Sequence, residues 1–136
     1  MSTSGADRFD TSIAPWLAVG DAQKAVDFYK AAFDAVELYR LDGDDGSLAV
    51  AQLSVDGAVF WVQDEPEASP QASPQAQGTG SIRMILSVED PDVMFDRAVT
   101  AGAAVVARVS EGHGWRTGRI TDPFGHDWEI SRQLAS

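Results

Sequence analysis

The sequence predicts an α+β fold built from two βαβββ modules in tandem. Two observations predict it: apolar strands and amphipathic helices follow the same order in both halves, and a polar low-complexity segment separates the halves. The aligned pairs are Val19-Gly20-Asp21 with Val88-Glu89-Asp90, Ala35-Val36 with Ala104-Val105, Gly57 with Gly125, and Phe60 with Trp128. The chain of 136 residues is therefore expected to form one domain.

Module one is expected over residues 13–63. An apolar strand over Ile13–Val19 precedes Asp21, a residue type favoured at the N-cap of a helix. The helix that follows is predicted from apolar residues at helical spacing. Its range and those of the three later strands are Ala22–Phe33, Ala35–Leu41, Leu48–Ser54 and Ala58–Val62.

Module two, expected over residues 81–133, repeats this order. Asp90 is its N-cap candidate, Pro91 suits the first helical turn, and Gly102 is a candidate helix stop. Asp122-Pro123-Phe124-Gly125 has the residue types of a type I turn. The predicted elements are strand Ile82–Val88, helix Pro91–Ala101, and strands Ala104–Val109, Thr117–Thr121 and His126–Ser131.

Two segments lack the composition of a folded element. Residues 1–12 are polar, which predicts a disordered N-terminus and not a secretory signal. Residues 64–80, DEPEASPQASPQAQGTG, are rich in Pro, Ser and Gln and predict a linker between the modules.

Composition restricts the partners and the chemistry. The formal charge of −11 argues against binding to nucleic acids and to anionic membrane surfaces. The absence of cysteine excludes disulfides, thiolate metal sites and cysteine nucleophiles. No apolar run is long enough to span a bilayer, and we expect a cytoplasmic protein.

His126 and Glu129 lie close together in the sequence and could be mistaken for a metal pair. Strand side chains alternate between faces, so His126 and Glu129 should point to opposite sides. Trp128 and Ile130 are expected to pack under the helices, with His126 as a structural residue beside the turn. His113, in the Gly-rich loop EGHGW, is expected to be exposed.

The early motif VGDAQKAVDFYKAAF and the late motif GRITDPFGHDWEIS resemble the vicinal oxygen chelate superfamily, the glyoxalase / bleomycin resistance protein / extradiol dioxygenase group. They most resemble its PhnB-like branch, and the resemblance covers about Ile13 to Arg132. It implies two modules that curl their sheets into an open, cup-shaped mixed sheet. It also implies a homodimer with two cups shared at the interface.

Metal-using members of this superfamily place His, Glu or Gln ligands at four strand positions. The resemblance carries these positions over to Ala14, Gln52, Arg83 and Glu129. Alanine has no donor atom and arginine is a permanent cation, so two of the four positions cannot ligate a metal. We therefore expect no metal ligands and no cofactor.

Side-chain alternation predicts which residues face the cup. The ligand-binding candidates are Trp16, Gln52, Trp61, Arg83, Arg119 and Glu129. The two tryptophans could stack on a planar ligand or a cation, or could simply fill the cup or the dimer seam. Arg83 could hold a ligand anion, or could merely neutralise Glu129 as an ion pair.

Three functions remain open at this point. The first is metal-free binding of a small molecule in a Trp-lined cup at a dimer interface, where the acidic balance suits a basic aromatic ligand. The second is a divalent-metal-dependent lyase, isomerase or dioxygenase. The third is a metal-free enzyme in which Glu129, the only catalytic candidate, acts as a general base.

Overall fold

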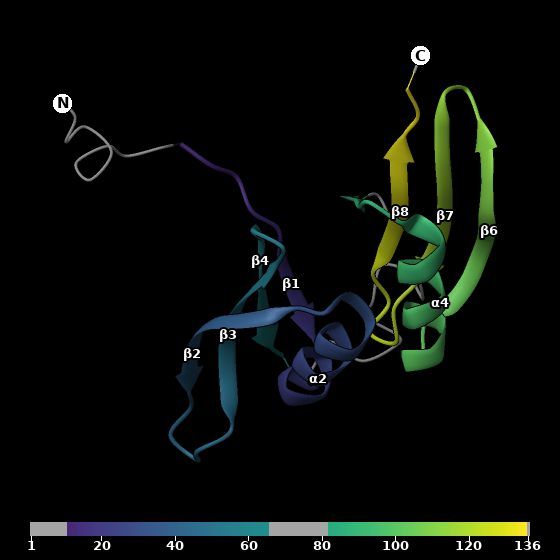
Figure 1. The fold of residues 1–136 in the computed structure, drawn as a ribbon. Helices are drawn as coiled ribbons and strands as arrows, with labels where there is room; N and C mark the ends of the chain where they lie inside the picture. Colours follow the sequence, from purple (N-terminus) through teal and green to yellow (C-terminus); the bar gives the residue numbers. More distant parts are fainter. Residues whose placement is uncertain (1–10, 66–81, 136) are drawn as a thin grey trace, which may run out of the picture.

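The computed structural model describes residues 11–65 and 82–135 of the chain (Figure 1). The expected disordered residues 1–10 and the expected linker residues 66–80 lie outside the described part. The described residues form two four-stranded mixed sheets, each with one helix, which confirms the predicted α+β fold of two βαβββ modules. Within these residues, no helix is long and apolar enough to cross a membrane.

Module one consists of strand β1, helix α2 and strands β2 to β4. In its sheet the strand order is β1-β4-β3-β2, with β1 parallel to β4 and the other pairs antiparallel. The bounds are β1 Trp16–Val19, α2 Ala22–Phe33, β2 Val36–Asp42, β3 Leu48–Val55 and β4 Ala58–Asp64.

The first strand is shorter than the sequence predicted. It begins at Trp16 and not at Ile13, whose side chain is 98% exposed. Pro15 explains this, because proline has no backbone N–H to donate to the neighbouring strand. The carbonyl of Pro15 still accepts the N–H of Trp61 over 2.9 Å, so pairing starts at that group.

Module two has the same topology, with strand order β5-β8-β7-β6 and a parallel β5–β8 pair. The bounds are β5 Arg83–Ser87, α4 Pro91–Ala101, β6 Ala104–Gly112, β7 Trp115–Thr121 and β8 Asp127–Gln133. Strands β6 and β7 are longer than predicted, because His113 and Gly114 turn with positive φ angles of 54° and 84° and bring the strands together close to the turn. Such a two-residue turn matches the twist of paired strands.

Both helices have the ends that the sequence predicted. The side chain of Asp21 accepts the N–H of Lys24 at the start of α2, and Asp90 accepts that of Val93 at the start of α4. Helix α4 ends at Gly102, whose φ of 124° is unfavourable for other residues. These caps satisfy N–H groups that have no partner within a helix.

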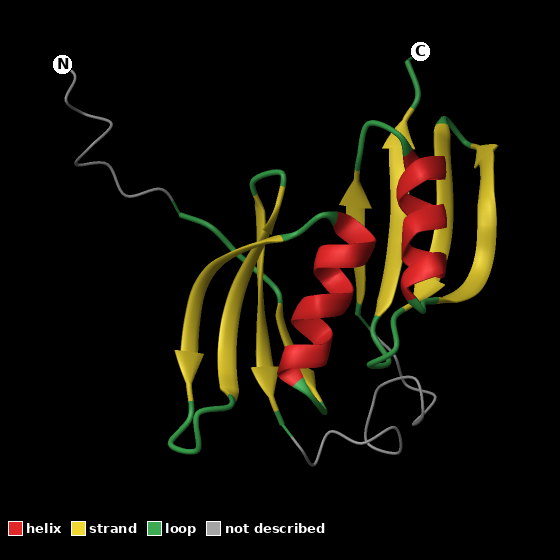
Figure 2. Ribbon diagram, turned by 60° about the horizontal axis from the view of Figure 1, so that its bottom comes forward, coloured by secondary structure: helices red, strands yellow, loops and turns green. Residues whose placement is uncertain are grey.

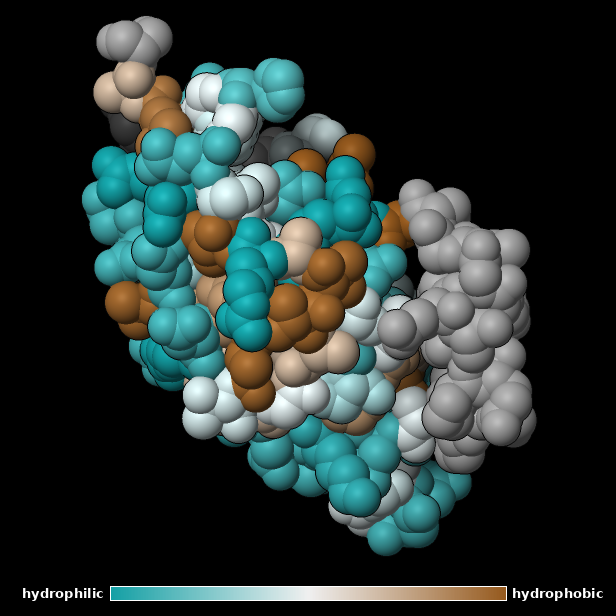
Figure 3. All heavy atoms as spheres, turned by 90° about the vertical axis from the view of Figure 1, so that its right-hand side faces the viewer, coloured by the Kyte–Doolittle hydropathy of each residue, from teal (hydrophilic) through white to brown (hydrophobic). Residues whose placement is uncertain are grey.

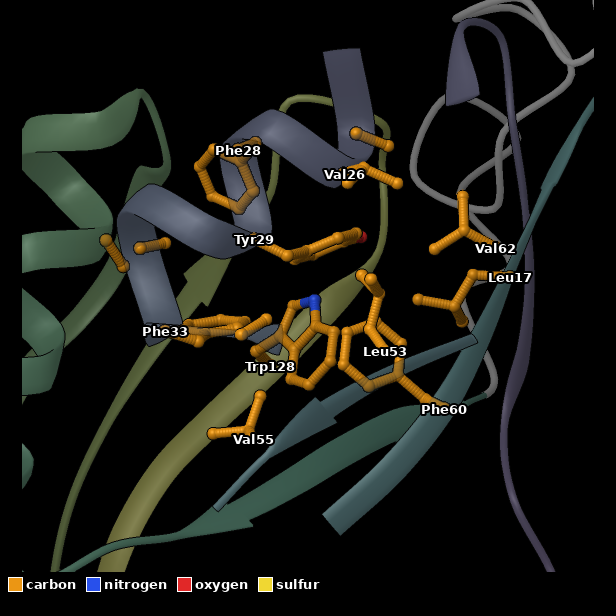
Figure 4. Packing of buried hydrophobic residues seen from close by; sticks show 14 of the residues in the cluster. Leu17, Val26, Phe28, Tyr29, Phe33, Leu53, Val55, Phe60, Val62 and Trp128 are labelled. Atoms are coloured by element: carbon orange, nitrogen blue, oxygen red, sulfur yellow. The ribbon is translucent and has the colours of Figure 1, made fainter. Parts of the chain in front are cut away.

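The helix-covered faces of both sheets contribute to one hydrophobic core. Trp128 of β8 lies beside residues of module one (Figure 4), with its ring centroid 4.8 Å from Phe33 and 5.4 Å from Phe60. Ile130 is fully buried, so the predicted packing of Trp128 and Ile130 under the helices is confirmed. A tryptophan of module two thereby completes the core of module one.

A buried carboxylate adds polar contacts between the modules. Oδ2 of Asp122 accepts hydrogen bonds from the Tyr29 hydroxyl and from Nε1 of Trp128. Oδ1 accepts two N–H groups of its own turn, those of Phe124 and His126. The predicted Asp-Pro-Phe-Gly turn is therefore present, and its aspartate also bonds to α2.

Each helix lies against one face of its own sheet (Figure 2). We call the sheet face on the other side, away from the helix, the open face of that module. Both open faces carry side chains that have no helix to cover them. They are the natural place to look for a binding site.

Candidate functional site

The open face of module one carries a row of aromatic rings. Trp16 of β1 and Trp61 of β4 are direct neighbours in the parallel pair, and their rings stack with centroids 5.7 Å apart and an interplanar angle of 25°. Tyr39 of β2 meets Trp61 edge to face at 6.1 Å. Trp16 is 52% exposed and Tyr39 48%, so much of this aromatic surface is available for contact.

Two amides complete this aromatic row. Oε1 of Gln63 accepts the indole N–H of Trp16 over 2.7 Å, which fixes the orientation of the Trp16 ring. Gln52 of β3 is half-buried and is the cross-strand neighbour of both Tyr39 and Trp61. All five side chains are uncharged, so the row offers aromatic stacking and neutral hydrogen bonds.

The open face of module two is polar and charged. Glu129 of β8 is held at both oxygens: Nε of Arg83 lies 3.2 Å from Oε1, and the hydroxyl of Thr117 donates to Oε2 over 3.1 Å. The expected Arg83–Glu129 ion pair is therefore present. Asp127, the first residue of β8, accepts the hydroxyl of Thr121 over 2.9 Å.

Arg119 of β7 lies beside Glu129 as its cross-strand neighbour. The residues before and after it, Gly118 and Ile120, are buried on the helix side, which places Arg119 on the open face. Its Nε is buried and has no hydrogen-bond partner. Within residues 11–65 and 82–135, no carboxylate forms an ion pair with it.

Arg116 is a contrasting arginine on the helix side of the same strand. Its guanidinium contacts Asp92 of α4 through two hydrogen bonds, of 2.6 and 3.0 Å, and reaches Glu111 at 3.4 Å. These contacts lower the pKa of Asp92 and raise that of Arg116. Arg116 is thus engaged in a surface ion-pair network, whereas Arg119 is not.

The four positions that metal-using relatives would fill do not form a donor set here. Ala14 precedes β1 and has no donor, and Arg83 directs its positive charge at Glu129. The described ranges contain no group of three or more His, Asp or Glu arranged to hold a metal ion. Gln52 and Glu129 lie on different modules, so the residues present do not fit a divalent cation within one chain.

Neither histidine joins this arrangement. His126 directly precedes β8, and its Nε2 lies 2.9 Å from the carbonyl oxygen of Ala18, linking module two to β1. His113 is exposed in the β6–β7 turn. His126 therefore has the structural place that the sequence predicted.

The structure divides the six predicted ligand-binding residues into two groups. Trp16, Gln52 and Trp61 lie on the open face of module one, and Arg83, Arg119 and Glu129 lie on that of module two. Across the described part of the chain, no hydrogen bond, ion pair or aromatic contact joins the two groups. We call these two groups of candidate residues the half-sites of a single chain.

Three neighbours of these residues were not identified from the sequence. Gln63 is two residues beyond Trp61 and shares its face, but the predicted strand ended at Val62. Thr117 is two residues before Arg119, so alternation could have identified it. Tyr39 follows a register shift in β2, between Glu37 and Tyr39, which sequence patterns do not reveal.

A comparison with protein families decides the membership of the chain. The model of the Glyoxalase/Bleomycin resistance protein/Dioxygenase superfamily matches residues 9–130. The chain belongs to this superfamily. An uncharacterised protein from Mycobacterium bovis is 39% identical over 129 residues, which cover 92% of this chain and 85% of that protein. A second uncharacterised protein, from Arabidopsis thaliana, is 31% identical over 145 residues, which cover 94% of this chain and 86% of that protein.

Solved structures of similar fold include other superfamily proteins. TioX from Micromonospora sp. ML1 has a TM-score of 0.72 and 28% identity, covering 92% of this chain and 100% of TioX. A gene product from Arabidopsis thaliana has a TM-score of 0.68 and 30% identity, covering 91% and 100%. The fosfomycin resistance protein FosX from Listeria monocytogenes has a TM-score of 0.68 and covers 93% and 96%, but at 16% identity it shows the fold alone.

Proposed function

We propose that this superfamily member binds a small planar molecule, without a metal ion, in a cup shared between two copies of the chain. The observation that carries the proposal is the exposed aromatic row of Trp16, Trp61 and Tyr39. Large aromatic side chains are costly to leave in water, and exposed apolar groups on one face mark interaction sites. Amide groups beside the row supply the few polar contacts that orient a ligand.

The stacking geometry indicates where a planar ligand would bind. Inserting a ring between two others requires centroids roughly 7 Å apart, twice the contact distance of carbon atoms. Trp16 and Trp61 are 5.7 Å apart, so they stack on each other and leave no space for a third ring. The ligand would instead extend the stack on the exposed side of Trp16.

The surroundings of Glu129 disfavour a metal ion at its carboxylate. Arg83 and Thr117 engage both carboxylate oxygens. These contacts use one lone pair on each oxygen and hold the carboxylate beside the guanidinium of Arg83. The ion pair also places positive charge where a divalent cation would have to sit.

A second copy of the chain would bring the two half-sites together. Several large apolar side chains are exposed in a single chain, and Figure 3 shows one side of the molecule with a hydrophobic patch surrounded by hydrophilic residues. Burying such surface drives association. In the proposed homodimer, the open face of module one lies opposite the open face of module two of the partner.

Ligand binding is tested by titrating the protein with planar aromatic compounds while recording tryptophan fluorescence and heat. We expect quenching that Trp16→Ala abolishes and that Trp61→Ala weakens, because Trp61 supports the Trp16 ring from its other side. Val93→Ala, which changes an exposed apolar residue of α4, serves as the control and should leave the quenching intact. An absence of binding across neutral, cationic and anionic aromatic compounds would contradict the proposal.

Metal independence is tested on protein purified without chelator. Elemental analysis should find no stoichiometric metal, and Ni²⁺, Zn²⁺, Fe²⁺ and Mn²⁺ should leave the melting temperature unchanged. A stoichiometric ion, or a melting temperature raised by several degrees, would instead support the metal-dependent enzyme.

A further inference from the structure

We propose that Arg119 binds the anionic group of the ligand, so that the ligand class is an aromatic carboxylate. This inference rests on the proposed function and specifies its ligand. The first support is the unpartnered Nε of Arg119, which is buried on the open face of module two. Leaving a buried donor without an acceptor costs free energy, so Arg119 is not placed to serve a partner within the described residues. Its side chain as a whole is only half-buried, so an anion can reach the guanidinium beside this atom.

The neighbours of Arg119 explain why its charge is available. Glu129 is the adjacent carboxylate, but Arg83 and Thr117 engage its two oxygens. Asp127, the other acidic side chain of β8 on this face, accepts the hydroxyl of Thr121. Throughout residues 11–65 and 82–135, we find no hydrogen bond donated by the Arg119 guanidinium.

Arginine is well suited to this role. Its planar guanidinium presents donors in a fork that matches the two oxygens of a carboxylate, and such charge-assisted hydrogen bonds are about twice as strong as neutral ones. Arg83 lies on the same face and is 43% exposed at its side chain, so it adds positive potential without leaving Glu129.

The net negative charge of the protein suggested a basic ligand, but local charge matters more at contact distance. Charges in solution are screened within about 8 Å at physiological salt, whereas a half-buried guanidinium acts on an anion in direct contact. In the shared cup, the aromatic row of one chain would stack on the ring of the ligand. The carboxylate of the ligand would bind Arg119 of the second chain.

The experiment compares three probes of one shape by calorimetry: 2-naphthoate, neutral 2-naphthamide and cationic 2-naphthylmethylammonium. We expect 2-naphthoate to bind at least about tenfold more tightly than the other two, because a hydrogen bond to a charged group is worth roughly one to two factors of ten. Its affinity should fall as salt increases.

Arg119→Met then separates a ligand-binding role from a structural one. It should weaken 2-naphthoate at least about tenfold and leave 2-naphthamide unchanged, while the melting temperature stays equal or rises because an unpartnered buried donor is removed. The affinity of Arg119→Lys for 2-naphthoate should lie between those of the wild type and Arg119→Met. Arg108→Gln, an exposed arginine of β6, removes the same charge and should change nothing.

Several results would overturn the inference. One such result is equal affinity for 2-naphthoate and 2-naphthamide, with both affinities lost in Trp16→Ala. It would support the aromatic site and contradict an anion site at Arg119. If Arg119→Met weakened the homodimer but left 2-naphthoate binding unchanged, Arg119 would bind the partner chain and not the ligand. Tighter binding of the ammonium probe would reverse the ligand charge, and binding of none of the probes would reject the proposed function as well.

Discussion

The hydroxyl of Tyr29, on the helix of module one, donates a hydrogen bond to Oδ2 of Asp122, in the last turn of module two. Asp122 is almost fully buried, and Trp128 donates to the same oxygen over 2.9 Å. A buried charge is tolerated only when its hydrogen-bonding capacity is used. This carboxylate therefore ties the two modules together at the centre of their shared core.

Replacing Tyr29 with phenylalanine should destabilise the protein by about 1–3 kcal/mol, because Asp122 loses one of its donors while it remains buried. Urea denaturation at neutral pH measures this free energy. Tyr39→Phe is the matched control, since the Tyr39 hydroxyl makes no hydrogen bond within the described ranges, and it should change stability little. Equal effects of the two substitutions would contradict the assigned role of Asp122.

Stability should also fall in alkali through Tyr29. Burial and the Asp122 carboxylate raise the pKa of Tyr29 well above its ordinary value of 10.0. The folded protein keeps this proton at a pH where the unfolded chain has lost it. The contribution of the Tyr29 proton to the free energy of unfolding is therefore complete below about pH 10. It is lost as the pH rises toward the pKa of Tyr29 in the folded protein, by up to about 1.4 kcal/mol per pH unit.

The Tyr29→Phe variant isolates this alkaline effect. Other titrating groups are common to both proteins, so the difference in unfolding free energy between wild type and variant should shrink as pH rises above 10. A difference that stays constant from pH 8 to pH 11 would show that Tyr29 ionises normally in the folded state.

Gly118→Ala should destabilise by about 1–3 kcal/mol through overpacking. A Cβ atom at Gly118 would lie 2.8 Å from Cδ2 of Phe95 and 2.8 Å from Cγ2 of Val109, closer than real Cβ contacts allow. Gly112→Ala is the control, because nothing lies within 4 Å of its Cβ position. Thermal unfolding compares the two, and similar melting temperatures would refute close packing of β7 against α4.

Mixed dimers test whether each cup takes one half from each chain. Trp16→Ala damages one half-site and Arg119→Met the other, so neither variant alone should bind 2-naphthoate tightly. After equal mixing and subunit exchange, half of the dimers are mixed, and each has one intact cup. Calorimetry should then recover tight binding at about a quarter of the sites. No recovery after demonstrated exchange would place both half-sites in one chain.

Local chemistry explains why the helices could be predicted from the sequence. The two N-cap aspartates and the apolar spacing defined α2 and α4 at the bounds that the structure has. The Asp122 turn followed from its residue types, and alternation placed Trp128 inward. Strand ends were less certain, because backbone pairing beyond the apolar residues extends β6 and β8, and Pro15 shortens β1.

For the candidate site, the sequence predicted only which face of its sheet each residue lies on. Alternation places Trp16 and Arg119 on open faces, and it correctly pairs Arg83 with Glu129. It does not say how the two sheets are arranged, because that depends on contacts such as Trp128 with Phe60, which lie far apart in the sequence. For this reason, the sequence could not show that the six residues expected to line one cup lie on two different sheets in a single chain.

The position of Trp128 limits how this protein could be divided. Module one borrows this indole for its interior, so residues 11–65 expressed alone would leave Phe33 and Phe60 facing water. Such a fragment should aggregate or remain unfolded, and adding the complementary fragment should rescue it. Module one is therefore expected to fold only together with the strand that supplies this indole.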